Sequence, residues 1–282
     1  MDSRKRSRRL LYSGRTYVMG VLNVTPDSFY DKGMFFDPKK AVRRALEMER
    51  DGADIIDVGG ESTRPGAEDV SVDEELKRVI PVIRAISKRA KVAISVDTRK
   101  AKVADAALSA GASIVNDVSA LKEDPDMAGV VAKHRAGIVL MHMKGRPKDM
   151  QADPNYADLI EDIACSLKRS ISIAKRAGIK DCKIIIDPGI GFGKTVEHNL
   201  EILRSLGRFK KLGYPICVGT SRKSFIGKVL DSKYPEDRLA GSLATAAIAV
   251  MNGANIIRAH DVNATLKAVR MIDSVIGAKK RR

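Results

Sequence analysis

The sequence is poor in residue types that define several classes of protein. It has no tryptophan, only six tyrosines and six phenylalanines, and three cysteines among 282 residues. So few aromatic side chains offer little for base stacking, which argues against a single-stranded nucleic-acid binder. Cys165, Cys182 and Cys217 form no CxxC pair and lie near no His cluster. We therefore expect buried free thiols, without a disulfide framework or a thiolate metal site.

Long apolar runs are also absent. The longest, such as that around Ala244–Met251, are far shorter than the roughly 20 residues that cross a bilayer. The basic amino terminus lacks the apolar block of a secretory signal. Hydrophobic residues make up 44% of the chain and charged residues 30%, a balance typical of a globular core. We expect a cytoplasmic protein that makes no membrane contact.

The net charge of +16, from 51 basic and 35 acidic residues, is concentrated at the ends of the chain. Residues 1–10 and the last four residues each have a net charge of +4. Such runs are usually solvated, and they attract polyanions without reading a sequence. The pattern predicts no specific nucleic-acid partner.

Short β-branched runs alternate with longer helical patterns in eight successive units, which is typical of a parallel sheet with crossover helices. The length is close to the roughly 250 residues of an eightfold barrel. We predict an α/β protein with a single (β/α)8 TIM barrel over residues 16–276, a basic, flexible segment at 1–15 and a basic tail at 277–282. The predicted strands are Thr16–Asn23, Asp54–Gly59, Val92–Asp97, Ser113–Asp117, Gly137–Met143, Lys183–Asp187, Ile216–Gly219 and Asn255–Ala259.

Helix boundaries have their own signals. Asp37 can cap a first helix that begins with Pro38, because proline tolerates the first turn. Glycines that precede the strands are predicted to end helices in the left-handed conformation. They lie in Ala110–Ala112, Ala136–Gly137, Ala177–Gly178 and Asn252–Ala254.

Polar residues follow or end the apolar strands. In a closed parallel barrel the carboxyl ends of the strands meet at one rim, so distant positions can face one pocket. The strand-end residues are Asn23, Asp57, Asp97, Asn116, His142, Asp187, Ser221 and His260, with Arg258 inside the last strand.

Three of these residues carry acceptor groups that suit a heterocycle. Alone, Asp97 or Asp187 is more simply explained as a paired or capping carboxylate. Together with Asn116, they can accept a row of N–H donors from an amidine-like edge. We therefore predict that they recognise a ligand.

Basic residues after the last two strands predict an anion site. Lys223 follows the seventh strand, and Arg258 and His260 end the eighth. Surface lysines and lone histidines usually have no such role, but the loops after strands seven and eight commonly hold phosphate in this barrel class.

Three further segments complete the predicted pocket. Gly189–Lys194 has the wrong glycine spacing for a phosphate loop or a dinucleotide fingerprint, and is interpreted as a flexible rim loop in which Phe192 can stack on a planar ligand. Asn23–Gly33 and Gly59–Ala67 are long enough to be mobile lids over a charged substrate.

The motifs NVTPDSF, DVGGESTRPGA, SVDT, NDV, MHM, DPGIGFGK, GTSRKSFIG and RAHDV occur in the order found in bacterial dihydropteroate synthases. The chain resembles that family over roughly Thr16 to Ile276. Members are (β/α)8 barrels that join 6-hydroxymethyl-7,8-dihydropterin pyrophosphate to p-aminobenzoate. The resemblance implies the same reaction, a Mg2+ cofactor and a homodimer.

The resemblance also implies roles for individual residues. The pterin would be held by Asp97, Asn116, Asp187 and Lys223, with Met141 lining its pocket. Arg258 and His260 would hold the pyrophosphate, and Asn23 would bind the Mg2+ that accompanies it. The implied loop contacts are Thr63 and Arg64 in the second loop, Asp31 in the first, and Phe29, Pro65, Phe192 and Ser224 around the aminobenzoate.

The implied chemistry needs no nucleophilic Ser or Cys. Arg258, His260 and Mg2+ would neutralise the departing pyrophosphate, while Asp97 and Asp187, with Lys223 beside them, would favour the cationic pterin. The neutral aniline then attacks.

Two other functions stay open from the sequence alone. A methyltransferase of the same superfamily would keep the aspartates and the asparagine, but ESTRPG and SRKSF argue against it. A noncatalytic binder of pterins or polyanions would be consistent with the basic tails.

Overall fold

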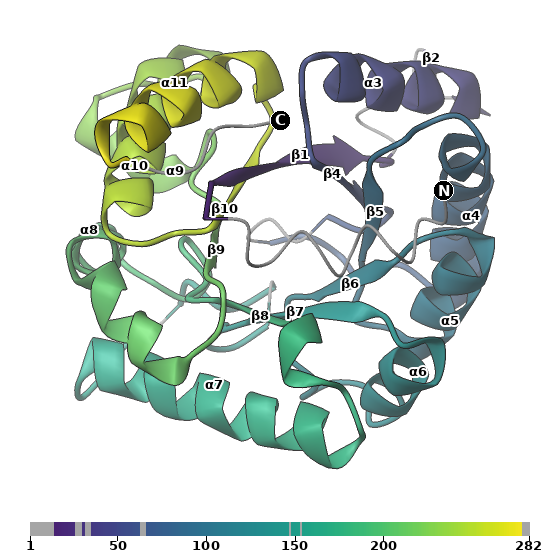
Figure 1. Cartoon of the computed structure of the whole chain (residues 1–282), viewed down its shortest axis with the longest axis horizontal. Coiled ribbons are helices and arrows are strands. Elements are labelled where there is room, and N and C mark those ends of the chain that lie inside the picture. The colour runs from purple at the N-terminus through teal and green to yellow at the C-terminus, as the bar shows by residue number, and fades with distance from the viewer. Residues whose placement is uncertain are drawn as a thin grey trace.

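The computed structural model describes residues 14–25, 30–31, 35–62, 66–146, 148–152 and 154–277, without the side chains of 30, 31, 35 and 36. Eight parallel strands form a ring, and helices surround it, as Figure 1 shows. The predicted single (β/α)8 TIM barrel is confirmed. Residues 1–13 and 278–282, which hold most of the two predicted basic tails, lie outside the described residues.

The ring runs β8-β7-β6-β5-β4-β1-β10-β9, and a parallel bridge between Ile186 and Ile216 connects its two ends. In the first loop, β2 (Tyr30–Asp31) pairs antiparallel with β3 (Phe35–Phe36). The barrel strands are β1 (Tyr17–Asn23), β4 (Ile55–Gly59), β5 (Ala93–Asp97), β6 (Ile114–Asp117), β7 (Gly137–Met141), β8 (Ile184–Asp187), β9 (Cys217–Val218) and β10 (Ile256–Ala259).

All eight predicted strands are present, with small errors at their ends. The first begins at Tyr17, because Thr16 bonds to a helix: its N–H and hydroxyl donate to Asp273 at 3.1 and 2.7 Å. β7 ends at Met141, two residues early, and Met143 packs in a cluster beyond the strand. Arg15, assigned to the N-terminal segment, forms an ion pair with Asp54 at 2.8 Å.

The helices bury one face each against the outside of the ring. They are α3 (Pro38–Arg50), α4 (Val72–Ser87), α5 (Ala101–Ala110), α6 (Met127–His134), α7 (Leu159–Arg176), α8 (Val196–Ser205), α9 (Ser224–Val229), α10 (Leu239–Met251) and α11 (Val262–Val275), with 3-10 turns η1 (Asp181–Lys183), η2 (Leu206–Leu212) and η3 (Pro235–Arg238). Within the described residues, no helix combines the length and the apolar character needed to span a membrane.

The start of α3 confirms one boundary prediction and the end of α6 corrects another. Asp37 caps α3 by accepting from the N–H of Lys39 at 2.8 Å, and Pro38 is the first helical residue. After α6, however, the left-handed residue is Arg135, with φ of 53°, and Gly137 is not among the residues with positive φ. The chain has already turned at Arg135, so Gly137 can begin β7 in extended form.

Two hydrophobic layers stabilise the barrel. Strand side chains that point inward, including Met19, Ile55, Val139 and Ile185, fill the centre, so the ring is a packed core and not a pore. A larger layer lies between strands and helices. The expectation of three buried thiols is wrong for two of them: Cys217 is buried in the centre, but Cys165 is half-buried and Cys182 is exposed.

Candidate active site

Charged side chains surround Arg258 of β10 at one end of the barrel. Its Nε donates to Asp57 Oδ2 and its Nη2 donates to Asp97 Oδ2, both at 2.7 Å. Asn116 donates to the same Asp57 oxygen at 3.0 Å. We call Asp57, Asp97, Asn116 and Arg258 the rim cluster. Four strands from distant parts of the chain meet here, as expected of strand carboxyl ends in a closed barrel.

The rim cluster leaves two carboxylate oxygens without a partner. Oδ1 of Asp57 and Oδ1 of Asp97 are buried and accept no hydrogen bond from the described residues. An unsatisfied buried acceptor costs roughly 1–3 kcal/mol. Such oxygens are therefore ready to accept N–H donors from a ligand.

Asp187 and Lys223 add a second acid and base beside the rim cluster. Burial raises the pKa of Asp187, and the charges of Lys223 and Arg258 oppose the shift. Loss of hydration lowers the pKa of Lys223 to about 8, opposed by Asp187. Each of these two predicted residues therefore lies within the electrostatic influence of the other.

The cluster also changes the protonation of its own members. Burial raises the pKa of Asp97 to about 7, with Arg258 lowering it and the charge of Asp57 raising it further. The pKa of Arg258 is raised by the same two carboxylates, so the guanidinium stays charged. The site thus holds a permanent cation between two acids, one of which titrates near neutrality.

The loop after β8 is held in place by hydrogen bonds and is not the flexible rim loop that its glycines predicted. The N–H of Gly189 donates to Asp187 Oδ1 at 2.7 Å, and that of Gly191 donates to Asn199 at 2.6 Å. Gly189 has φ of 71°, and a Cβ there would overlap the carbonyl oxygen of His142. Only glycine fits such a left-handed position against a neighbouring backbone.

A buried lysine fastens this loop to the end of β7. Lys194 is 3% exposed, and its ammonium donates to the carbonyl of Phe192 at 2.9 Å and lies 3.1 Å from His142 Nδ1. Burial lowers the pKa of Lys194 well below its usual value and that of His142 to about 2. Sequence reasoning missed Lys194 because its motif was weighed as a phosphate loop and a dinucleotide fingerprint and then interpreted as a flexible rim loop, with Phe192 as its one side chain for a ligand.

An apolar wall lies next to these polar groups. The side chains of Val118, Met141, Met143, Met150 and Phe192 form one buried cluster. The Lys223 ammonium lies 4.7 Å from the centre of the Phe192 ring, and it bonds to the carbonyl of Ile190. Met141 and Phe192, both predicted site residues, therefore share a wall that can cover a flat ligand.

The residues after β9 and β10 are linked to one another. The hydroxyl of Ser221 lies 3.1 Å from both the backbone N and the Nδ1 of His260. Arg222 binds Asp261 with two hydrogen bonds of 2.9 and 2.6 Å. Ser224, predicted to contact aminobenzoate, is the exposed first residue of α9.

The second loop is anchored at both stems by Arg99, which donates to Glu61 at 3.0 Å and to Asp69 at 2.9 Å. Phe29, Thr63, Arg64 and Pro65 lie outside the described residues, and Asp31 is described only as backbone in β2.

The rim offers oxygen ligands but no dedicated metal cage. Among the described residues, no group of three His, Cys, Asp or Glu side chains could hold a metal ion. Asn23, at the end of β1, is half-buried and supplies an amide oxygen. Mg2+ commonly uses one or two protein oxygens together with substrate phosphates, so this donor set fits an ion that arrives with a pyrophosphate.

Asp57 was missed as a site residue. The sequence showed only that Asp57 lies near the end of a strand. Other polar residues also lie near strand ends but do not belong to the rim cluster. Arg258, the partner of Asp57, is 201 positions away, so no local pattern could reveal the pair.

The chain is similar in sequence and in fold to known proteins. The sequence model described as "Pterin binding enzyme" matches residues 19–260. The dihydropteroate synthase of Bacillus subtilis is 51% identical over 267 residues, covering 95% of this chain and 91% of the relative. A Yersinia pestis dihydropteroate synthase structure with a sulfonamide drug is 45% identical, with a TM-score of 0.90 over 95% of this chain and 97% of that one. The Xanthomonas albilineans enzyme in complex with 7,8-dihydropteroate is 40% identical, with a TM-score of 0.85 over 95% and 97%.

Proposed function

This chain belongs to the dihydropteroate synthases, a family of pterin-binding enzymes, and we propose that the rim cluster is where it works. It is a transferase that condenses 6-hydroxymethyl-7,8-dihydropterin pyrophosphate with p-aminobenzoate, releasing pyrophosphate and forming 7,8-dihydropteroate in folate biosynthesis. The relatives reported above are synthases, which argues against the methyltransferase alternative.

The observation that carries the proposal is the pair of orphaned oxygens on Asp57 and Asp97. A pterin presents amino and ring N–H groups along one edge, and these donors satisfy acceptors that the folded protein leaves unmet. Asn116 and Asp187 extend the same row of polar groups. Met141 and Phe192 cover the faces of the ring.

Charge development explains the remaining residues. When the C–O bond to the pyrophosphate breaks, the electron pair leaves with the oxygen and positive charge develops on the pterin methylene. Asp97 and Asp187 stabilise that cation, and Lys223 orients the ring beside them. Nε and Nη2 of Arg258 bind the two aspartates, so its Nη1 can donate to the departing pyrophosphate. His260, which is held by Ser221, also binds the pyrophosphate. Preorganised charges of this kind typically supply the largest share of rate enhancement.

The nucleophile needs no general base from the protein, because it attacks as a neutral amine. The neutral amine of p-aminobenzoate attacks the methylene, forms the C–N bond, and then loses a proton to the departing pyrophosphate or to water. The loop residues Phe29, Asp31, Thr63, Arg64, Pro65 and Ser224 are proposed to hold the aminobenzoate and close over it.

Asn23 would hold Mg2+ through its amide oxygen together with the pyrophosphate. When bound, the ion neutralises negative charge that develops on the leaving oxygens.

The direct test is product formation. Purified chain with Mg2+, pterin pyrophosphate and p-aminobenzoate should yield dihydropteroate. Arg258→Ala and Asp187→Asn should each lose on the order of a hundredfold in turnover while retaining the wild-type circular dichroism spectrum. Binding of the pterin substrate without product by the wild-type chain would favour the noncatalytic alternative, and normal pyrophosphate release by both variants would refute these roles.

We also propose that two copies pair through α10 and α11, which contact each other and lie side by side in Figure 1. Large apolar side chains are exposed on them: Met251 (64%), Met271 (66%) and Val275 (74%). Large apolar side chains exposed on neighbouring helices are typical of a protein interface. The three free cysteines also support a reducing, cytoplasmic location.

A further inference from the structure

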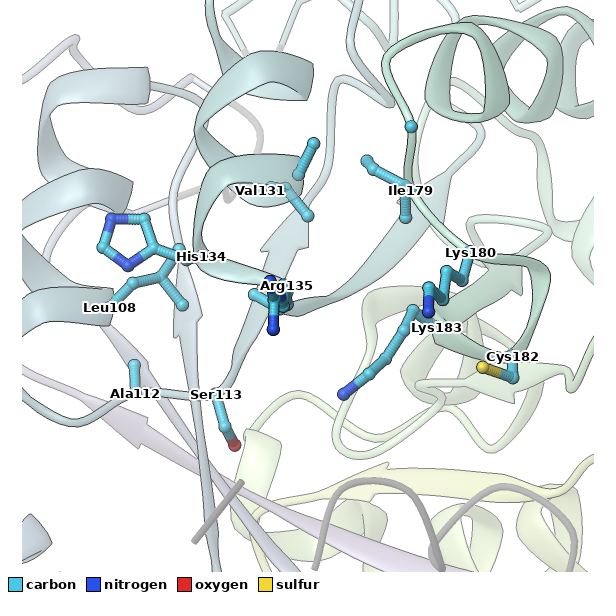
Figure 2. Close-up of a pocket in the computed structure, with 13 residues that line it drawn as sticks. Leu108, Ala112, Ser113, Val131, His134, Arg135, Ile179, Lys180, Cys182 and Lys183 are labelled. Carbon is cyan, nitrogen blue, oxygen red and sulfur yellow. The ribbon is translucent and has the colours of Figure 1, made fainter. Parts of the chain in front are cut away.

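A cavity of about 650 Å3 lies at the end of the barrel opposite the rim cluster. Its walls come from the last residues of α5 and α6 and from the segment between α7 and β8. Ser113, Ala136 and Lys183 line it and directly precede β6, β7 and β8. Figure 2 shows the lining side chains around it. The proposed reaction uses none of these residues.

The wall carries basic side chains and no acidic one. Its thirteen lining residues include His134, Arg135, Lys180 and Lys183, and no Asp or Glu. Two acids nearby in sequence are already paired, one of them with the lining residue His134. Asp105 pairs with Lys133 and lies 2.7 Å from His134 Nε2. Asp181 pairs with Lys175 at 3.1 Å and accepts from the hydroxyl of Tyr214 at 2.6 Å.

The backbone of Arg135 gives a second, independent observation. Arg135 is the C-cap of α6 with φ of 53°. The first residue with positive φ after α3, α5, α7 and α10 is a glycine: Gly52, Gly111, Gly178 and Gly253. A side chain with a Cβ is disfavoured in this conformation. Keeping a large side chain at such a disfavoured position supports a function for that side chain.

The helix termini alone do not explain this arrangement. The carboxyl ends of α5, α6 and α7 each present roughly half a negative charge, which favours nearby cations. Arg135 and Lys180 place two formal positive charges at this wall, and dipoles account neither for the hollow nor for an arginine in a glycine position. A negative ligand would be attracted by these two cations.

The other lining residues and the volume of the cavity indicate the chemical class of the ligand. Leu108, Val131 and Ile179 add apolar surface, and the volume falls in the range of roughly 300–1,000 Å3 typical of organic-ligand sites, well above the need of a bare ion. We propose that this cavity binds a small organic phosphate. Its phosphate lies against Arg135 and Lys180, where the guanidinium fork matches two phosphate oxygens, and its organic part packs on the apolar side chains.

Cys182 provides a reporter, because it is exposed and lines the cavity, whereas Cys165 is half-buried on α7 outside it. The experiment follows alkylation of both thiols by neutral iodoacetamide, by peptide mass spectrometry on the full chain. Phenyl phosphate is the probe, and phenol, benzoate and sodium chloride at matched ionic strength are the comparisons. We expect severalfold slower alkylation of Cys182 with phenyl phosphate alone, and an unchanged rate at Cys165.

Variants then assign the protection. Arg135→Gly and Lys180→Ala should lose it, while Lys133→Ala, which removes a charge from the same helix outside the cavity, should keep it. Arg135→Gly suits the left-handed backbone, so its melting temperature should not fall. All three variants should keep wild-type synthase turnover. The proposal is overturned by absent protection, by equal protection from sodium chloride or benzoate, or by protection that survives both cavity variants.

Discussion

Asp97 and Lys223 ionise near neutral pH because both are withdrawn from water beside other charges. The pKa of Asp97 is raised to about 7 and that of Lys223 is lowered to about 8. Asp97 accepts N–H donors through both carboxyl oxygens only when it is ionised, and protonated Lys223 then balances its negative charge. The free enzyme therefore has both groups in their working forms only in a narrow range.

This range predicts a bell-shaped profile of kcat/KM against pH, since that ratio reports the free enzyme. It should rise as Asp97 deprotonates through about pH 7 and fall as Lys223 deprotonates through about pH 8. Lys223→Arg keeps its charge at high pH and should flatten the alkaline limb. An alkaline limb unchanged in that variant would assign it to another group.

The structure identifies Asp57 as a site residue that the sequence did not predict. Asp57→Asn removes the charge that holds Arg258 Nε and should lower kcat/KM on the order of a hundredfold with a wild-type circular dichroism spectrum, because Arg258 keeps Asp97. Asp54→Asn is the matched control, since Asp54 precedes the same strand but binds Arg15 at the opposite end of the barrel. Equal losses in both variants would contradict a role specific to the rim.

At the scale of the element, strand positions were predictable from the sequence because parallel strands covered on both faces must be apolar throughout. Helix ends were harder. Ala136–Gly137 resembles the other glycine signals, yet the turn occurs at Arg135. The exposure of Cys182 was also missed, because apolar neighbours in sequence do not show that a turn such as η1 faces outward.

The loop after β8 gives a prediction at this scale. Gly189→Ala and Gly178→Ala both place a Cβ at positive φ, of 71° and 91°, which should cost about 1–2 kcal/mol of unfolding free energy. Gly178 has open space around it, but Gly189 faces the carbonyl of His142. Gly189→Ala should therefore lose about 1–3 kcal/mol more, together with pterin affinity. Urea unfolding and pterin titration measure the two losses, and equal stability of both variants would disprove the close fit.

For the whole molecule, eight repeated units were enough to predict closure, and closure alone placed the predicted acids on one rim. Contacts between distant residues, such as Arg258 with Asp57, depend on how far each strand is staggered against its neighbour. That stagger arises from the packing of the entire ring and leaves no trace in any local segment.

The exposed face of α10 and α11 predicts the assembly state. Met251→Asp with Val275→Asp should convert a dimer to a monomer by placing charge in an apolar interface. Lys168→Asp on α7, which is 60% exposed at its side chain, is the control. Light scattering after size exclusion gives the mass, and a wild-type monomer, or a double variant that stays dimeric, would contradict the proposed surface.

The hydrogen bonds between Thr16 and Asp273 also have a consequence for folding during synthesis. β1 pairs with β10, and the residue before it bonds to a helix 257 positions later. A ribosome delivers β1 early, but its second neighbour emerges only when synthesis is nearly complete. One edge of the first strand therefore stays unpaired through most of translation, and a nascent chain can complete the ring only after β10 has emerged.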